Sequence, residues 1–290
     1  MDSTLFFVSD LHGDTKKYDR LFQMVEEENP AAVFLGGDLL PSGLLNLVST
    51  ELIQKDYING FLGRALLKLK EKMSDRYPRI FVILGNDDSK SDEENIIKLA
   101  DAGLWEYIHN RKVSFGEYTL YGYSYVPPSP FRLKDFERYD VSRYVDPGCL
   151  PPEEGMYSVP VNRELIKIQT IKKDLDILID ESDLSKSILL FHSPPYQTKL
   201  DRADLDGKSI EHVPLDVHIG SIAIKRMIQK RQPLITLHGH VHESARITGE
   251  WQEKINTTFA FSAAHDGSEL ALVRFDPNKP ELATRTLIPC

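Results

Sequence analysis

The chain has 290 residues, of which 41% are hydrophobic and 27% charged, so it suits one large α/β domain or two small ones with an ordinary globular core. Its net charge of −9 counts against a dedicated nucleic-acid binder, because an acidic surface repels phosphate backbones. The sequence contains no basic leader before a long apolar run, no apolar stretch of about 20 residues and only two cysteines. We therefore expect a cytoplasmic protein with no membrane segment and no disulfide framework.

The first hundred residues alternate short apolar runs with amphipathic stretches. Residues 15–28 predict a helix capped by Asp14, since apolar positions recur there every three or four residues. Strands are expected at residues 4–8, 31–35 and 79–84, and further helices at about 51–75 and 92–100. This alternation indicates parallel βαβ units, in which ligands bind at the carboxyl ends of the strands.

The second part of the chain has a different pattern. We expect a hairpin at 112–115 and 118–123, helices at 163–179 and 221–230, and strands at 187–191, 234–237, 257–262 and 269–275. From Ala245 onward, the sequence has the alternating pattern that is typical of strands. A proline-rich loop at about 125–160 is either a lid over the substrate or a solvated, partly ordered loop without such a role. No repeat or linker divides the chain, so we expect a single domain, 1–290, with this loop as an insertion.

Polar side chains that can ligate metals follow five of the apolar strands. They comprise two carboxylates, one amide and four imidazoles, namely Asp10, His12, Asp38, Asn86, His192, His240 and His242. This mixed set of nitrogen and oxygen donors suits Mn, Fe, Zn, Co or Ni and is poor for Mg alone. Seven donors are too many for one tetrahedral site, but they fit two metals that share a carboxylate.

Two metals bound close together point to phosphoryl chemistry. Such a pair clamps the attacking and leaving oxygens and lowers the pKa of a bridging water, so that hydroxide is available near neutral pH. Its positive charge would attract a small phosphorylated substrate despite the net charge of −9. The residues therefore predict a phosphoester hydrolase.

The five blocks, in this order, resemble the calcineurin-like metallophosphoesterases from Asp10 to His242. The resemblance implies a four-layer α/β/β/α sandwich of two mixed sheets flanked by helices, and two divalent transition-metal ions, with Mn the best choice in vitro. It also implies that Asp38 bridges the metals. One metal would then be held by Asp10, His12, Asp38 and His242, and the other by Asp38, Asn86, His192 and His240.

The chain departs from this family after the Gly-Asn pair, where relatives carry a histidine that assists the leaving group and this sequence carries Asp87. An aspartate beside two cations stays ionised and cannot donate a proton. Asp87 could orient a water or a ligand group, could cap its own turn, or could mark substrates whose leaving group needs little protonation. If another residue is the acid, the candidates are His238, His218 and His265.

We accordingly expect a dinuclear hydrolase that favours phosphodiesters over monoesters. Asp87 and His238 are the candidate catalytic residues, and Asn86 and Arg132 are the candidate substrate contacts. The alternative is a catalytically weak or inactive scaffold of the same fold that binds proteins. Retention of all seven ligands argues against this alternative, because a scaffold has no physical need of them.

Overall fold

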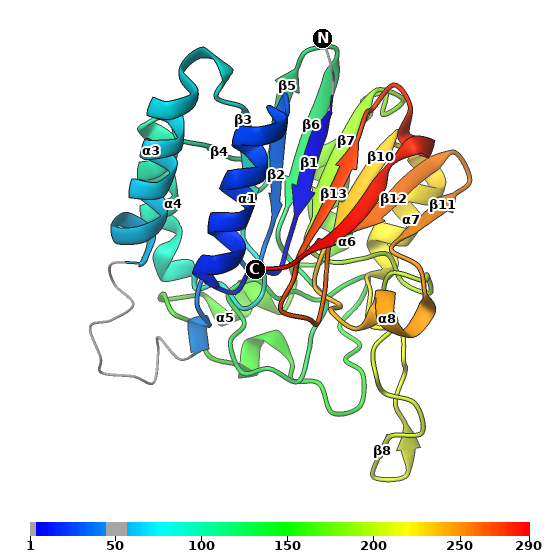
Figure 1. The fold of residues 1–290 in the computed structure, drawn as a ribbon. Coiled ribbons are helices and arrows are strands. Elements are labelled where there is room, and N and C mark those ends of the chain that lie inside the picture. The colour runs from blue at the N-terminus through cyan, green and yellow to red at the C-terminus, as the bar shows by residue number, and fades with distance from the viewer. Residues whose placement is uncertain (1–3, 45–56) are drawn as a thin grey trace.

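A computed structural model describes residues 4–44 and 57–290 of the chain. Two six-stranded sheets lie face to face (Figure 1). The first sheet has the strand order β14-β13-β1-β2-β3-β4, with β1 to β4 parallel and β13 and β14 antiparallel to their neighbours. Its strands are β1 (Leu5–Val8), β2 (Ala32–Gly36), β3 (Arg79–Ile83), β4 (Glu106–Tyr107), β13 (Leu270–Phe275) and β14 (Thr284–Ile288).

The second sheet is mixed as well. Its order is β11-β12-β10-β7-β6-β5, with antiparallel edge strands β5 and β11 and parallel pairing between β6, β7, β10 and β12. The strands are β5 (Arg111–Phe115), β6 (Tyr118–Tyr123), β7 (Ser187–Phe191), β10 (Ile235–His238), β11 (Gln252–Ile255) and β12 (Thr258–Ser262). The predicted hairpin formed by β5 and β6 is confirmed.

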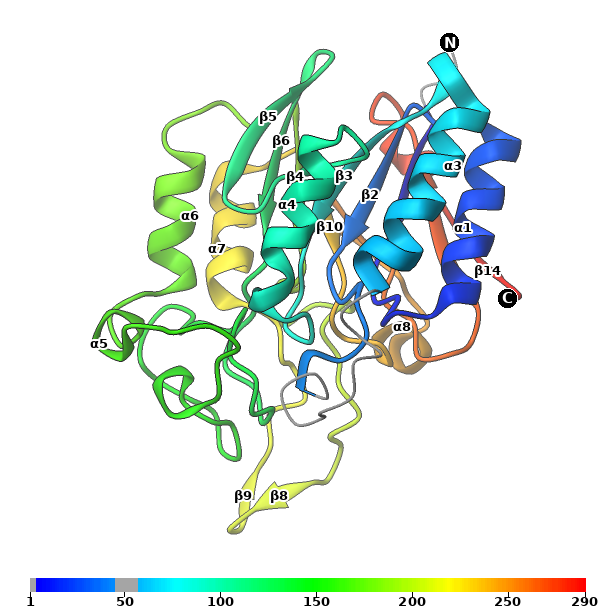
Figure 2. The same ribbon diagram turned by 90° about the vertical axis from the view of Figure 1, so that its left-hand side faces the viewer.

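Helices cover the outer faces of both sheets (Figure 2). The first sheet carries α1 (Thr15–Glu28), α3 (Arg64–Met73) and α4 (Glu93–Asp101), and the second carries α6 (Ile171–Ile179) and α7 (Ile222–Arg231). A π-helical turn, Tyr57–Gly63, leads into α3, while the predicted helical residues 51–56 lie outside the described part of the chain. The expected four-layer sandwich is thus confirmed.

Alternation along the strands builds two apolar layers. In β1, Phe6 and Val8 pack with the helices, whereas Leu5 and Phe7 pack between the sheets. The ring of Phe261 in β12 lies 5.8 Å from that of Phe275 in β13, which joins one sheet to the other. This packed sandwich holds the strand ends in fixed positions, so side chains that follow the strands are placed by a rigid scaffold.

The residues that cap the helices explain the outcome of two helix predictions, those for residues 15–28 and 163–179. The prediction of α1 is confirmed, since the Asp14 carboxylate accepts hydrogen bonds from the Lys16 and Lys17 amides. The prediction of one helix over 163–179 is wrong, because the chain forms α5 (Arg163–Ile166) and then restarts at α6, where the Thr170 hydroxyl accepts a hydrogen bond from the Lys173 amide. A short helix, α8 (Ser244–Thr248), also interrupts the region expected to be all strand.

Two long loops extend beyond the carboxyl ends of the strands. The loop from 125 to 160 contains an ion pair between the buried side chains of Lys134 and Glu137. The second loop, after β7, carries a small hairpin of β8 (Ser209–Ile210) and β9 (Val213–Pro214) that projects from the body (Figures 1 and 2). None of the helices in the described residues combines the length and apolar sequence needed to cross a membrane.

Candidate active site and metal centre

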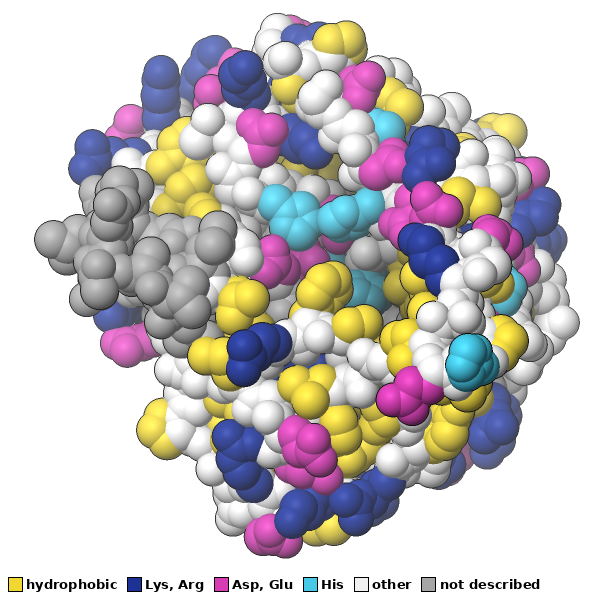
Figure 3. Space-filling view, turned by 90° about the horizontal axis from the view of Figure 1, so that it is seen from below, with side chains coloured by type: hydrophobic (Ala, Val, Ile, Leu, Met, Phe, Trp, Pro, Cys, Tyr) yellow, Lys and Arg dark blue, Asp and Glu magenta, His cyan; other side chains and the backbone are white. Residues whose placement is uncertain are grey.

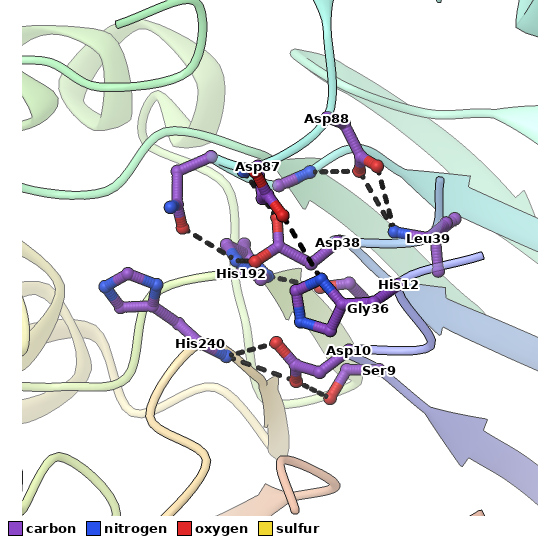
Figure 4. A network of polar contacts seen from close by, with 12 residues as sticks. Ser9, Asp10, His12, Gly36, Asp38, Leu39, Asp87, Asp88, His192 and His240 are labelled. Atoms are coloured by element: carbon purple, nitrogen blue, oxygen red, sulfur yellow. Dashed lines mark hydrogen bonds and ion pairs between the residues drawn. The ribbon is translucent and has the colours of Figure 1, made fainter. Parts of the chain in front are cut away.

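The carboxyl ends of five strands bring the predicted ligands together, and Figure 4 shows Asp10, His12, Asp38, His192 and His240 among them. In the first sheet these ends belong to the adjacent parallel strands β1, β2 and β3, and in the second sheet to the adjacent strands β7 and β10. The residues that follow these strands are Asp10, His12, Asp38, Asn86, His192, His240 and His242. The site therefore lies at one edge of the sandwich, between the two sheets.

The ligand atoms form two clusters that share one carboxylate. Donor atoms of Asp10, His12, Asp38 and His242 all lie within 4.8 Å of one another, and the same holds for Asp38, His192 and His240. Asn86 belongs beside the second cluster, since its Oδ1 lies 3.1 Å from His192 Nε2. The structure thus divides the seven residues in the way that the resemblance implies.

Backbone geometry singles out the same residues. Four of them are in the left-handed region, which residues other than glycine seldom adopt, with φ angles of 57° at Asp10, 47° at His12, 51° at Asp38 and 75° at His240. Such conformations cost about 1–3 kcal/mol each and gather at functional sites. Composition and periodicity gave no sign of this strain.

Two glycines are needed because the ligands approach the backbone closely. A β carbon at Gly85 would lie 2.3 Å from Asp38 Oδ1 and 2.6 Å from His192 Nε2. Gly37, with a φ of +93°, would place a β carbon 2.6 Å from His192 Nδ1. Any side chain at these positions would displace the ligands.

Hydrogen bonds orient the ligand side chains from behind. His192 Nδ1 lies 2.8 Å from the Gly36 carbonyl oxygen, which leaves Nε2 directed toward Asp38. The Asp87 amide donates to Asp38 Oδ1 at 2.7 Å, and the His240 amide donates to Asp10 at 3.0 Å. These contacts fix ring and carboxylate orientations in the way that metal sites require.

The electrostatics of the site favour added positive charge. Burial opposes protonation of His12, but the Asp87 hydrogen bond and the charges of Asp38 and Asp10 raise its pKa to about 9. Burial likewise opposes ionisation of Asp38, yet the nearby imidazole of His192 lowers its pKa to about 2. His12 Nε2 and His242 Nε2 also converge to 3.1 Å. Paired carboxylates and converging imidazoles are a donor set that fits divalent transition metals.

Asp87 and Asp88 have different tasks. The fully buried Asp88 carboxylate accepts hydrogen bonds from the Gly85, Leu39 and Leu40 amides, and burial raises its pKa to about 7. Asp88 therefore caps the turn, a role that was one of the alternatives for Asp87. The Asp87 side chain instead accepts a hydrogen bond from the Ser42 hydroxyl at 2.8 Å and faces His12.

The structure separates the three candidate proton donors. His238 is fully buried on the Phe191 ring, and its nitrogens lie 2.9 Å from the Ser193 carbonyl oxygen and 2.8 Å from the Thr236 hydroxyl. It fills a place in the core, so we withdraw it as a catalytic candidate. His265 contacts Glu269 at 3.1 Å and is not part of the cavity described below.

His218 does line that cavity. Its Nδ1 lies 2.8 Å from Oδ1 of Asp201, whose buried carboxylate also accepts hydrogen bonds from the Gln197, Thr198 and Gly220 amides. The sequence offers no spacing signal for this pair, because Asp201 and His218 stand 17 residues apart in a loop. The arrangement holds the imidazole in a fixed orientation at the cavity wall.

Arg132 does not reach the site. Its side chain is exposed, and the cavity is lined instead by its neighbours Phe131 and Leu133. Alternation along an extended segment turns the arginine outward, so we withdraw it as a substrate contact. Asn86 does line the cavity, as a substrate contact requires.

A cavity of about 670 Å³ opens in front of the ligand clusters. His12, Asp38, Asn86, His240 and His242 form its floor, and the two long loops form its walls. Figure 3 shows histidine side chains and carboxylates in this hollow, bordered by hydrophobic side chains.

Comparisons with known proteins agree with this geometry. The family model described as calcineurin-like phosphoesterase matches residues 3–244. A comparison with curated proteins finds no match to this sequence. Among solved structures, TT1561 of Thermus thermophilus covers 98% of both chains at 13% identity, with a TM-score of 0.53. A dimetal phosphatase from Danio rerio covers 93% of this chain and 91% of its own, also at 13% identity, with a TM-score of 0.52.

A third solved structure, the phosphopantetheinyl hydrolase PptH from Mycobacterium tuberculosis, covers 90% of this chain and 89% of its own at 11% identity, with a TM-score of 0.51. At such low identity these likenesses concern the fold. The family match spans most of the chain, however, and the chain belongs to the calcineurin-like phosphoesterases. It is therefore a metal-dependent phosphoesterase with a candidate metal site at Asp10, His12, Asp38 and His242.

Proposed function

We propose that the chain hydrolyses phosphodiesters at a dinuclear centre in which Asp38 is shared by two divalent transition metals. One observation carries the proposal, namely that the two ligand clusters have the Asp38 carboxylate in common. When bound, such metals supply Lewis acidity to the phosphate oxygens and a water of lowered pKa. The neighbouring Asn86 is available to hold a phosphate oxygen through its side-chain amide.

The charge of the cavity wall favours diesters over monoesters. The wall contains several carboxylates, among them Asp140, Asp146 and Asp216, which repel a monoester dianion more than a diester monoanion. Asp87 faces His12 and Ser42, so no proton donor stands where the family has its histidine, and another residue must supply the proton.

His218 is the residue that we propose as proton donor. When the bond between phosphorus and the leaving oxygen breaks, the proton of the ring nitrogen opposite Asp201 passes to that oxygen. Nδ1–H donates to Asp201, so the form of His218 that gives up the proton on Nε2 is the imidazolium, which the Asp201 carboxylate stabilises. His218 is thus given the task that the histidine after Gly-Asn has in other members of the family.

The test is hydrolysis of bis(4-nitrophenyl) phosphate in Mn²⁺ beside 4-nitrophenyl phosphate. We expect the diester to be the faster substrate. We expect Asp38→Asn to slow its hydrolysis by at least about 100-fold, because loss of a residue that binds the metals directly should reduce activity more than loss of a residue that only orients a metal ligand. Asp176→Asn, which changes an exposed carboxylate on α6, is the matched control and should leave the rate unchanged. Faster hydrolysis of the monoester would overturn the preference for diesters.

Absence of turnover on either ester, with metal shown to be bound, would overturn the hydrolase and favour the scaffold.

A further inference from the structure

The cavity is much larger than a phosphate group requires. Its volume of about 670 Å³ lies in the range that encloses a drug-sized ligand. The ligand clusters occupy only its floor, so most of its wall faces the part of the substrate that does not react. The chemistry of that wall indicates what the rest of the substrate is.

Apolar side chains from both long loops make up the wall. They include Leu133 and Val145 from the first loop and Leu205, Ile210, Leu215 and Ile219 from the second. The loops meet where Ile210 lies against Gly148, because a β carbon at Gly148 would be 2.2 Å from Ile210 Cδ1. This contact joins the two loops within the cavity wall.

Large apolar side chains are also exposed around this cavity. Phe131 is 61% exposed and Ile210 is 40% exposed, although both line it. Apolar surface around a polar site marks a binding surface, because removing that surface from water is favourable in free energy. A ligand with an apolar group would cover these side chains.

Cations are missing from the same wall. Within residues 4–44 and 57–290, no lysine or arginine lines the cavity. The first loop does carry cations, but Lys134 pairs with Glu137, Arg138 with Asp174 and Arg143 with Glu153. Arg132 in the same loop is exposed and does not line the cavity. The described part of the wall therefore contains no lysine or arginine to neutralise a second phosphate or a carboxylate.

The polar part of the wall is acidic. Asp140 accepts hydrogen bonds from the Ser221 hydroxyl and the Ile222 amide, so a carboxylate already occupies the N-terminus of α7, where an anion could otherwise bind. Asp216 accepts a hydrogen bond from the Tyr196 hydroxyl at 2.5 Å. An additional anionic group on the substrate would be repelled here.

We propose that the substrate is a phosphoester of an apolar alcohol, with a single phosphate and no second anionic group. Its phosphate lies over the ligand clusters and its apolar group lies between the two loops. The assignment rests on the proposed hydrolysis, which places the phosphate. It disfavours nucleoside polyphosphates and acidic phosphopeptides, because their further charges would meet carboxylates rather than cations.

The experiment uses a series of methyl alkyl phosphates, all monoanions, whose alkyl chain has one, four or eight carbons. Binding to the Mn²⁺-loaded protein is measured by calorimetry, so the readout does not depend on turnover. We expect the dissociation constant to fall by at least about 30-fold from one carbon to eight, which burial of roughly two to three of the added methylenes would give at about 0.8 kcal/mol each. An eight-carbon ester that ends in a carboxylate should bind as weakly as the one-carbon ester.

A pair of variants tests whether the alkyl chain binds against the apolar wall of the cavity. Ile210 lines the cavity, whereas its cross-strand partner Val213 does not and is similarly exposed, at 49%. Ile210→Asn should weaken binding of the eight-carbon ester by about fivefold, while Val213→Asn should leave it unchanged. Both residues lie on the projecting hairpin, so neither change should unfold the protein, which thermal unfolding would check.

Equal binding of all chain lengths, or equal losses in the two variants, would overturn the apolar substrate even if the esters are hydrolysed. Tight, chain-dependent binding without hydrolysis would support it and would instead overturn the proposed reaction. The two proposals can therefore fail separately.

Discussion

His12 Nδ1 lies 3.4 Å from Oδ2 of Asp87, while His12 Nε2 faces His242 at 3.1 Å. The aspartate lines the cavity, but its carboxylate is directed at a proposed metal ligand. Its other oxygen accepts the hydrogen bond of the Ser42 hydroxyl. A carboxylate in this position orients the imidazole and increases its basicity toward a metal. This relationship favours the interpretation of Asp87 as an orienting residue.

We predict that Asp87→Asn weakens metal binding without changing how the enzyme responds to leaving groups. The dissociation constant for Mn²⁺ should rise by about 10-fold or more, since orienting partners of metal-bound histidines have effects of 10- to 100-fold. Calorimetric titration would measure the affinity, and a set of phenyl diesters of different leaving-group pKa would measure the response. A selective loss with poor leaving groups, at unchanged metal affinity, would show that Asp87 donates the proton after all.

A second prediction concerns the proposed proton donor. His218→Gln should lower kcat for an alkyl leaving group by about 100-fold, because general acid catalysis contributes 10²–10⁴-fold. The 4-nitrophenyl ester should lose little, since its leaving group needs no protonation. His265→Gln is the matched control, because His265 pairs with Glu269 outside the cavity lining. Equal losses on both substrates would assign His218 a structural role.

The sequence predicts the proposed ligands because each one follows directly on an apolar strand. Parallel strands of one sheet end at a common edge, so Asp10 and Asp38 converge without any information from the loops. His192 follows β7 of the second sheet and joins them because the two sheets pack face to face. His238 was misjudged because period-two alternation places it on the side of His240 only while the strand continues. The chain turns at Gly239, and His238 stays in the core.

The contacts made by the loops could not be predicted from sequence patterns. Asp201 meets His218, and Gly148 meets Ile210, through turns whose geometry depends on tertiary packing. The break before α6 had a local signal in Thr170, a good N-cap residue, yet apolar periodicity continues across it. Sequence patterns thus predict the strands and their ends better than the walls of the cavity.

A third prediction concerns the stability of the loop at 125–160. The side chains of Lys134 and Glu137 are fully buried, and Lys134 also donates to the Ser129 carbonyl oxygen at 2.7 Å. Lys134→Met should lower the free energy of unfolding by about 3 kcal/mol, because it leaves a buried carboxylate without its partner. Urea denaturation would measure the change.

The exposed pair Lys172–Asp176 supplies the control for that measurement. Lys172→Met should cost less than about 1 kcal/mol, since exposed ion pairs contribute little. The double variant Lys134→Met/Glu137→Leu should recover most of the lost stability, because an apolar pair replaces a buried ion pair at little cost. Similar losses at Lys134 and Lys172 would contradict this account of the loop.

The last prediction is a loss of stability in acid that originates at His109. Its Nδ1 accepts a hydrogen bond from the Ser124 amide at 3.0 Å, and its ring packs against Tyr125 and Phe136. Burial, followed by the positive charges of Lys90 and Arg138, lowers its pKa from 6.5 to about 3. The folded protein therefore keeps this ring neutral at a pH where the unfolded chain binds a proton.

The contribution of His109 to stability must then fall as the pH drops from about 6.5 to about 3, by up to about 1.4 kcal/mol per pH unit for one proton. His109→Gln removes the titrating group while its side-chain oxygen can still accept from the Ser124 amide. The variant should be less stable than the wild type at pH 7, and this difference should shrink toward pH 4 in urea denaturation. A difference that stays constant over this range would mean that His109 is not held neutral by the fold.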